Sequence, residues 1–331
     1  MLLSTVGLII GFVVLIISAD YFVKGASSLA RNIGISPLII GLTIIGLGTS
    51  APEMLVAGMA SWNGNTGLAV GNAIGSNIAN IGLVLGMSAI VAPIFIQSSL
   101  LRREFPLLLL FSSVSFLLLI DGQLSSLDGM LLLTGLFLFL AWLIKTAHQS
   151  RQLKIDPLDS EFNAEIPIDI KTSQAAFFCI SGLIGLILSS KLLVWAAINI
   201  ATYFGVSDLI IGLTIVALGT SLPELAASIT SILKKEPDLA LGNIIGSNIF
   251  NLLAVLCLPG LIHPGPITAD VVSRDMPFML FITFLLFFLS FGFGKEANIG
   301  RGKGVILVFL FTAYLGKLYI DTTGFSFNIL S

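Results

Sequence analysis

The sequence contains few charged residues. Asp, Glu, Lys and Arg together make up 10% of its 331 residues, whereas 56% are hydrophobic and the mean hydropathy is +1.04. Soluble domains carry roughly a quarter charged residues. The composition therefore excludes a soluble globular domain and predicts an integral membrane protein.

Cysteine, histidine and basic runs are also scarce. The two cysteines, Cys179 and Cys257, lie in apolar stretches, and a disulfide framework or zinc site would need more of them. The two histidines, His148 and His263, do not form the helical pair that a metalloprotease needs. The net charge of −2 and the lack of a basic run exclude nucleic acid as a partner. We expect a protein that is not an enzyme and needs no cofactor.

Long apolar runs dominate the chain instead. A helix needs roughly 20 apolar residues to cross the hydrocarbon layer, and helices are the default because unpaired backbone groups are costly in lipid. Ten runs meet this requirement. They cover approximately residues 2–23, 36–60, 67–91, 104–120, 127–147, 174–199, 207–232, 238–260, 276–293 and 303–320. The sequence thus predicts an all-α membrane protein with about ten transmembrane helices in the lipid bilayer.

A polar connection divides these ten spans into five and five. We expect a first five-helix unit at residues 1–147, a cytoplasmic loop at 148–172 and a second five-helix unit at 173–331. If the N-terminus lies outside, the sixteen Lys and Arg residues lie on the inner side except Lys191, Arg274 and Lys317. This bias follows the positive-inside rule and predicts both termini outside. The short loops suit a prokaryotic plasma (inner) membrane.

The two halves carry the same motifs at a constant offset of 171 residues. GLTIIGLGTSAPE at Gly41–Glu53 matches GLTIVALGTSLPE at Gly212–Glu224 at ten of thirteen positions. AVGNAIGSNIAN at Ala69–Asn80 matches ALGNIIGSNIFN at Ala240–Asn251 at nine of twelve. A repeat of five spans reverses its direction when it recurs, so the copies are predicted to be inverted. Such an arrangement places a binding site at the repeat interface near the membrane midplane.

Two glutamates, Glu53 and Glu224, interrupt these apolar helices at equivalent positions. An ionisable group at that depth costs several kcal/mol and usually faces a cavity or an ion path. Each follows a proline, which disrupts the preceding turn and frees backbone carbonyls such as those of Gly48 and Gly219. Hydroxyl residues stand three and four positions before each glutamate, on the same helix face. These residues are Thr49, Ser50, Thr220 and Ser221.

The partner helices add further serine and amide side chains. They are Asn72, Ser76, Asn77 and Asn80, with Asn243, Ser247, Asn248 and Asn251 in the second copy. About half of such small and amide residues serve only to join helices. The others complete an all-oxygen set, which suits a hard cation such as Ca²⁺ or Na⁺. Two ionised glutamates would balance one divalent cation, and they would repel each other without it, so exchange for monovalent cations or protons is favoured.

GTSAPE, GTSLPE and the two GSNI blocks resemble the alpha repeats of the cation/calcium exchanger superfamily, in particular prokaryotic sodium/calcium exchangers. The resemblance implies secondary active antiport of Ca²⁺ for Na⁺ by alternating access, in which the first helix of each repeat moves across the bundle. It also implies a set of ion ligands. These are Thr49, Ser50, Glu53, Ser76 and Asn80, then Thr220, Ser221, Glu224, Ser247 and Asn251, with the backbone carbonyls of Gly46 and Ala217.

One departure and several alternatives remain open. Some relatives carry an aspartate where this chain has Asn251, so the charge of the site is lower here. A Ca²⁺/H⁺ antiporter would use protonation of the glutamates, but that branch typically has Asn-Ala before its key glutamate, where this chain has Ala-Pro and Leu-Pro. Another divalent cation would also suit oxygen ligands. A channel shares this chemistry, yet an inverted repeat with broken helices favours a transporter.

Overall fold

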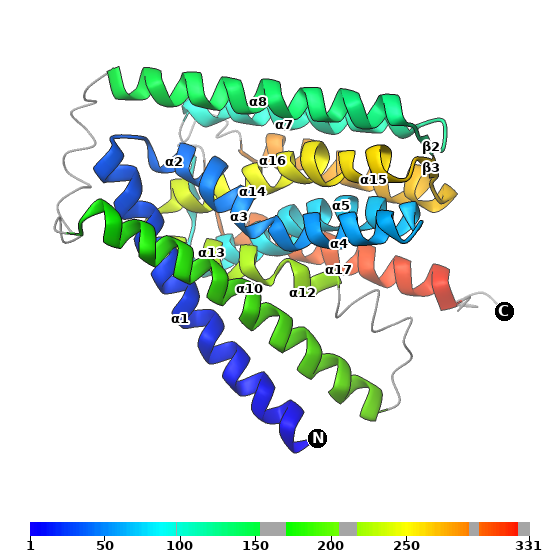
Figure 1. The fold of residues 1–331 in the computed structure, drawn as a ribbon, viewed down its shortest axis with the longest axis horizontal. Helices are drawn as coiled ribbons and strands as arrows, with labels where there is room; N and C mark the ends of the chain where they lie inside the picture. The colour runs from blue at the N-terminus through cyan, green and yellow to red at the C-terminus, as the bar shows by residue number, and fades with distance from the viewer. Residues whose placement is uncertain (97, 153–169, 205–216, 291–297, 324–331) are drawn as a thin grey trace.

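The computed structural model describes residues 1–96, 98–152, 170–204, 217–290 and 298–323, and these are almost entirely helical (Figure 1). Elements labelled η are short π-helical segments that continue an α-helix. In chain order the elements are α1 (Leu2–Ile33), α2 (Pro37–Ile40), η1 (Gly41–Ile45), α3 (Gly46–Thr49), α4 (Ala51–Trp62), α5 (Thr66–Ala79), η2 (Asn80–Leu85), α6 (Gly86–Val91), β1 (Ile94–Phe95), α7 (Ser98–Leu119), β2 (Gln123–Leu124), α8 (Ser126–Gln152), α10 (Thr172–Tyr203), α12 (Ala217–Thr220), α13 (Leu222–Leu233), α14 (Pro237–Phe250), η4 (Asn251–Val255), α15 (Cys257–Ile262), β3 (Gly265–Pro266), η5 (Val271–Asp275), α16 (Met276–Ser290), β4 (Asn298–Ile299) and α17 (Arg301–Thr323).

Several helices extend beyond their predicted apolar spans. Helix α1 continues past residue 23 to Ile33 and ends at Gly34, whose left-handed φ of 70° lets its N–H bond the carbonyls of the last turn. Helix α8 continues to Gln152, so residues 148–152 of the predicted loop are helical. The hydrocarbon thickness limits only the length of the apolar part of a helix, so a polar helix end can extend beyond the hydrocarbon layer. Residues 153–169 of the predicted loop lie outside the described part of the chain.

Seven described helices are long and apolar enough to cross a membrane, or eight if the bent pair Pro37–Thr49 and Ala51–Trp62 counts as one span. Large apolar side chains cover their outward faces: Leu2 is 81% exposed, Trp62 82% and Phe309 69%. Such surfaces require an apolar solvent. The chain is therefore a multi-pass membrane protein. The predicted count of ten is not confirmed, because α7, which covers the predicted span 104–120, is not among these helices, and residues 207–216 of another predicted span lie outside the described residues.

Helices α1 and α10 form an antiparallel pair, which extends away from the other helices in Figure 1. Their contacts show the direction, because Gly11 packs on Leu193, whereas Gly25 packs on Cys179. The pair packs in a hydrophobic cluster that also includes residues of α2, η1, α13 and α14, whereas the larger cluster contains no residue of α1 or α10. An inverted repeat requires this antiparallel relation between its two first helices.

The other helices pack reciprocally between the two halves. Helix α4 contacts α15 and η4, and its counterpart α13 contacts α6 and η2. Each of the two short sheets also joins the two halves, because β1 pairs with β4 and β2 pairs with β3, both antiparallel. Each half thus covers the other, and the sequence motifs meet in the centre of the bundle.

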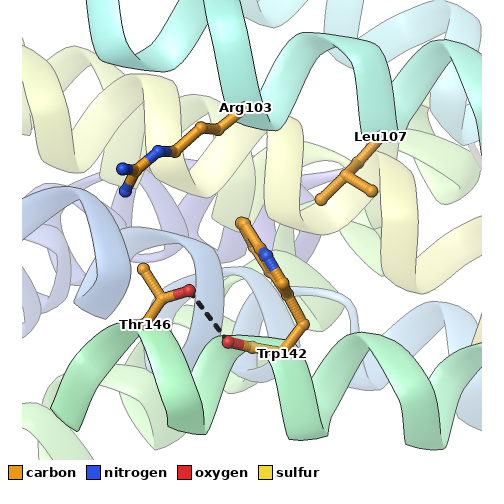
Figure 2. Close-up of a pocket in the computed structure, with 4 residues that line it drawn as sticks. All are labelled: Arg103, Leu107, Trp142 and Thr146. Atoms are coloured by element: carbon orange, nitrogen blue, oxygen red, sulfur yellow. Dashed lines mark hydrogen bonds between the residues drawn. The ribbon is translucent and has the colours of Figure 1, made fainter. Parts of the chain in front are cut away.

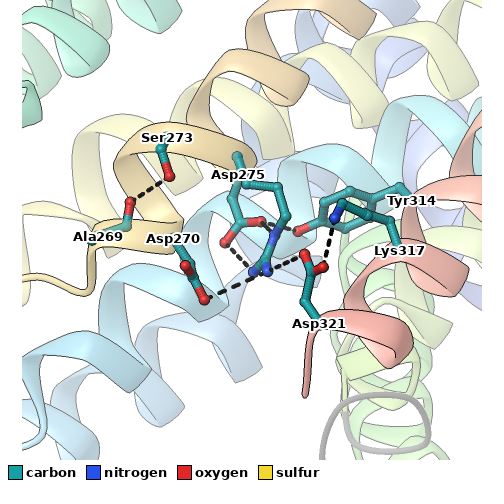
Figure 3. Close-up of polar contacts among 8 residues, drawn as sticks. Ala269, Asp270, Ser273, Asp275, Tyr314, Lys317 and Asp321 are labelled. Carbon is teal, nitrogen blue, oxygen red and sulfur yellow. Dashed lines mark hydrogen bonds and ion pairs between the residues drawn. The ribbon is translucent and has the colours of Figure 1, made fainter. Parts of the chain in front are cut away.

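A group of ion pairs joins η5 to α17 (Figure 3). The guanidinium of Arg274 contacts Asp275 at 2.7 Å and Asp321 at 3.1 Å, and Lys317 contacts Asp321 at 2.6 Å. The hydroxyl of Tyr314 donates to Asp275 at 3.0 Å. Arg274 therefore connects two helices through charged hydrogen bonds, which are stronger than neutral ones.

Replacing Arg274 with methionine should destabilise the protein, because it leaves the buried Asp275 carboxylate without its cation and removes the Arg274–Asp321 contact between η5 and α17. Hydrogen bonds to charged groups contribute about 2 kcal/mol, so we expect a clear fall in the Tm measured in detergent. Arg301→Met is the matched control, since Arg301 is exposed and contacts only the Val91 carbonyl, at 3.5 Å, among the described residues. Equal Tm values for the two variants would contradict a stabilising role for the Arg274 ion pairs.

Candidate functional site

Two broken helices supply the glutamates of the site. Helix α3 ends at Thr49 and α4 begins at Ala51, and the two parts of this helix differ in direction by 42°. Ser50, between them, has a φ of −80° and a ψ of 2°, outside the helical region. Ser221 interrupts the second copy in the same way, with a φ of −87° and a ψ of 3°.

Each proline lies in the first turn of the helix that follows the break, where its missing N–H has no helical partner to lose. Glu53 and Glu224 lie in the same first turns. Glu53 is 1% exposed and Glu224 is fully buried, and their carboxyl groups are near enough to repel each other when both are ionised. The fold thus brings together two carboxylates that are 171 positions apart in the sequence.

Hydroxyl groups cross from each copy to the glutamate of the other. Thr49 and Ser50 face the carboxyl group of Glu224, although neither oxygen of Glu224 accepts a hydrogen bond within the described residues. Thr220 and Ser76 face the carboxyl group of Glu53. Each carboxylate therefore faces at least one hydroxyl group from the other half of the chain.

Asn243 on α14 connects Thr49 to the helix that carries Glu224. Its Oδ1 accepts a hydrogen bond from Thr49 Oγ1 at 3.0 Å, and its Nδ2 donates to Ser228 Oγ at 2.9 Å and to the Glu224 carbonyl at 3.3 Å. The equivalent Asn72 donates to the Glu53 carbonyl at 3.2 Å. Neither asparagine was among the predicted ligands, although their recurrence at the 171-residue offset was a signal for this shared role.

Ser247, also on α14, connects the site to the backbone of α3. Its hydroxyl lies 3.2 Å from that of Thr49 and donates to the Gly46 carbonyl at 3.3 Å. The predicted carbonyl of Gly46 therefore lies beside the predicted hydroxyls. This approach depends on Gly246, because a Cβ added there would lie 2.6 Å from the Leu42 carbonyl oxygen.

Asn80 and Asn251 each begin a π-helical turn, η2 and η4. Such turns interrupt the regular backbone pattern and are frequent at functional sites. Both side chains are buried, at 1% and 0% exposure, and neither amide group has a hydrogen-bond partner among the described residues. Two predicted ligands thus carry buried polar groups that remain unsatisfied within the protein.

Other buried oxygens of the candidate site share this property. Buried polar groups normally have hydrogen-bond partners, and each exception needs an explanation. Among the predicted ligands, the buried oxygens without a partner in the described residues are Ser50 Oγ, Glu53 Oε2, Asn80 Oδ1, Ser221 Oγ, Glu224 Oε1, Glu224 Oε2 and Asn251 Oδ1. Carboxylate, amide and hydroxyl oxygens are the ligands that hard cations prefer, so the donor set fits Ca²⁺ or Na⁺.

Two backbone predictions have different outcomes. The Gly219 carbonyl, expected to be free, accepts a hydrogen bond of 2.6 Å from Ser190 on α10. That expectation was wrong, because the sequence does not show that a helix distant in the chain supplies a donor. Ala217 is the first residue of α12, at the position equivalent to Gly46. The role of its carbonyl stays a prediction.

Comparison with known proteins agrees with this geometry. The chain matches the family described as sodium/calcium exchanger protein over residues 3–145 and 174–319. It is 50% identical to CaxA of Alkalimonas amylolytica, named as a candidate antiporter, over 96% of this chain and 99% of that protein. It is 44% identical to the inner membrane protein YrbG of Escherichia coli K12, over 96% and 98% of the two chains.

The fold also matches a solved structure of the sodium–calcium exchanger NCX_Mj, soaked with 2.5 mM Na⁺ and 0.1 mM Ca²⁺. The TM-score is 0.81 at 33% sequence identity, and the match covers 96% of this chain and 99% of the other. The family match spans both halves of the chain and includes both glutamate motifs. The chain therefore belongs to the sodium/calcium exchanger protein family, a family of membrane antiporters.

Proposed function

We propose that the protein exchanges Ca²⁺ for Na⁺ across the membrane by alternating access. The observation that carries the proposal is the group of buried, unsatisfied oxygen atoms around Glu53 and Glu224. The predicted ligands on both copies contribute to this group, which supports one shared cation site formed by Thr49, Ser50, Glu53, Ser76, Asn80, Thr220, Ser221, Glu224, Ser247 and Asn251, with the carbonyls of Gly46 and Ala217.

The charge of the site supports exchange and not a one-way leak. Two ionised glutamates neutralise one Ca²⁺, and without a cation they repel each other in a medium of low dielectric constant. Monovalent cations would relieve that repulsion when Ca²⁺ leaves. Because Asn80 and Asn251 are both amides, these two partner positions add no third carboxylate. The amides supply neutral oxygen atoms at the first residue of each π-helical turn.

The α1–α10 pair supports a mechanism of alternating access. The larger hydrophobic cluster contains no residue of α1 or α10, so the pair can shift against that cluster while its contacts with α2, η1, α13 and α14 change. Ser190 on α10 also bonds the Gly219 carbonyl beside the second helix break, which couples this pair to the site. We propose that movement of the pair exposes the site to one side of the membrane and then to the other.

We also propose the topology that the basic residues predict. Residues 1–147 and 173–331 form two inverted five-helix repeats in a plasma (inner) membrane, with both termini outside and residues 148–172 in the cytoplasm. The antiparallel α1–α10 pair and the reciprocal contacts of α4 and α13 support the inversion.

Flux measurements on reconstituted vesicles test the proposed exchange. Vesicles that contain the purified protein are loaded with Na⁺, diluted into Na⁺-free buffer and assayed for uptake of radioactive Ca²⁺. A parallel sample replaces the Na⁺ gradient with a pH gradient. We expect rapid Ca²⁺ uptake with the Na⁺ gradient and only background uptake with the pH gradient.

The other outcomes separate the alternatives. Uptake with the pH gradient alone would identify Ca²⁺/H⁺ antiport, in which glutamate protonation replaces Na⁺ binding. No Ca²⁺ movement under either gradient would contradict the choice of substrate, and the assay would then be repeated with Mn²⁺ and Mg²⁺.

A further inference from the structure

The two halves share a third motif, which the proposed exchange does not use. Arg-Glu-Phe-Pro at Arg103–Pro106 lies 171 positions before Arg-Asp-Met-Pro at Arg274–Pro277. Downstream, at an offset of 172 positions, Ala-Trp-Leu-Ile-Lys at Ala141–Lys145 shares three of five residues with Ala-Tyr-Leu-Gly-Lys at Ala313–Lys317. The first pair of segments lies on α7 and on η5 with α16, and the second pair lies on α8 and α17.

In the second half, the arginine of the motif binds a carboxylate of the protein itself. Arg274 bonds Asp321, which stands four positions after Lys317 on α17. Phe278 and Tyr314 stack beside this group with ring centroids 4.8 Å apart. The equivalent of Asp321 in the first half, four positions after Lys145, is the neutral Gln149.

In the first half, a pocket lies at the corresponding place between α7 and α8. It has a volume of about 220 Å³ and is lined by Arg103, Leu107, Trp142 and Thr146. Figure 2 shows the Arg103 side chain extending from α7 toward α8, with the Trp142 indole between the two helices. The lining matches the second half, since Leu107 corresponds to Phe278 and Trp142 to Tyr314.

Arg103 forms no ion pair with the residues that the structure describes. Its side chain is exposed, and no carboxylate of the described residues lies within ion-pair distance of it, in contrast to Arg274. The neighbouring Glu104 interacts electrostatically with Arg103, but its carboxyl group is buried, at 4% exposure, and it does not line the pocket. A guanidinium at the edge of a pocket, without an equivalent of Asp321, is suited to an external anion.

We propose that this pocket binds a phosphate group, which takes the place of the Asp321 carboxylate. The planar guanidinium of Arg103 matches two phosphate oxygens at once, and the exposed Lys145 on α8 adds positive charge nearby. Leu107 and Trp142 provide an apolar wall for the carbon atoms attached to the phosphate. The phosphate can belong to an anionic lipid headgroup or to a free phosphate ester.

The predicted topology favours the lipid as the source. The pocket lies at the end of α7 and α8 where the sequence places the cytoplasmic surface, and basic pockets between helices at that surface bind anionic headgroups. This inference does not rest on the proposed exchange, because no residue of the pocket belongs to the proposed cation site.

Native mass spectrometry of the full-length protein in neutral detergent tests the proposal. Phosphatidylglycerol, phosphatidylcholine and inorganic phosphate are each titrated against the wild type and the variants Arg103→Gln, Gln149→Asp and Lys171→Gln. Lys171 is the matched control, since it is exposed, is predicted at the same membrane surface and does not line the pocket. Gln149→Asp introduces a carboxylate at the sequence position that corresponds to Asp321.

We expect the wild type to bind phosphatidylglycerol more tightly than phosphatidylcholine. Arg103→Gln and Gln149→Asp should each weaken phosphatidylglycerol binding about fivefold, the size expected for one basic residue at a membrane surface, and Lys171→Gln should not. Saturable binding of inorganic phosphate that depends on Arg103, without a lipid preference, would support the pocket and identify a free phosphate as its ligand. Equal binding by Arg103→Gln and wild type, or an equal loss in Lys171→Gln, would overturn the proposal.

Discussion

Replacing Glu224 with glutamine is expected to abolish Ca²⁺ exchange while leaving the protein folded. Glutamine keeps the shape of the side chain but removes one of the two negative charges that face a buried cation. Removing one partner of a buried charge pair costs about 3–5 kcal/mol, which corresponds to a loss of at least about a hundredfold in Ca²⁺ affinity. The same result is expected for Glu53→Gln, because both carboxylates contribute to one site.

Glu104→Gln is the matched control for these variants. Glu104 is also a buried carboxyl group in an apolar helix, at 4% exposure, and its Oε2 has no hydrogen-bond partner among the described residues. It lies outside the proposed cation site, so its variant should keep Ca²⁺ uptake near the wild-type rate. Vesicle uptake and Ca²⁺ binding by calorimetry measure the effect. Retained exchange in Glu224→Gln, with Glu104→Gln equally active, would reject Glu224 as an ion ligand.

Replacing Gly246 with alanine should disrupt the contact between α14 and the first broken helix. The added Cβ would lie 2.6 Å from the Leu42 carbonyl oxygen and 2.9 Å from the Leu42 Cα, so backbone would have to move. Overpacking of this kind costs about 1–3 kcal/mol, and more where backbone meets backbone. Because Ser247 and Asn243 on the same helix contact Thr49, we also expect Ca²⁺ uptake to fall at least about tenfold.

Gly316→Ala is the control for this prediction. Gly316 lies on the exposed side of α17, and no atom of the described residues lies within 4 Å of an added Cβ there. An alanine in a helix is more favourable than a glycine by about 1 kcal/mol, so this variant should have an equal or higher Tm and normal uptake. If Gly246→Ala had the Tm and uptake of Gly316→Ala, the close approach of α14 to η1 would be unnecessary for function.

The candidate residues could be predicted from the sequence because polar groups are conspicuous in apolar helices. Glu53 and Glu224 stand at equal places in two repeated motifs, and a carboxylate in hydrocarbon is too costly to be incidental. The helix breaks at Ser50 and Ser221 were also predictable, since Pro52 and Pro223 cannot continue the preceding helix. These features depend on local chemistry, which the order of residues specifies directly.

Contacts between distant segments could not be predicted in this way. No pattern shows that Thr49 and Ser50 face Glu224 of the other copy, or that Ser190 occupies the Gly219 carbonyl. The central position of Asn243 was missed for the same reason, although its repetition was visible. Each of these contacts depends on where one helix lies relative to another, which hydrophobic patterning alone does not determine.

The sequence by itself determined the membrane environment, the repeat and the residue types of the site, because these follow from hydropathy and from the local cost of polar groups in lipid. The tertiary structure decided which copy supplies hydroxyl groups to which glutamate, where the helices end and which arginine forms an ion pair. Arg103 and Arg274 illustrate the difference, because they occupy matching motifs, yet only Arg274 contacts a carboxylate among the described residues. The physical reason is that side-chain contacts between helices form only after the helices have packed.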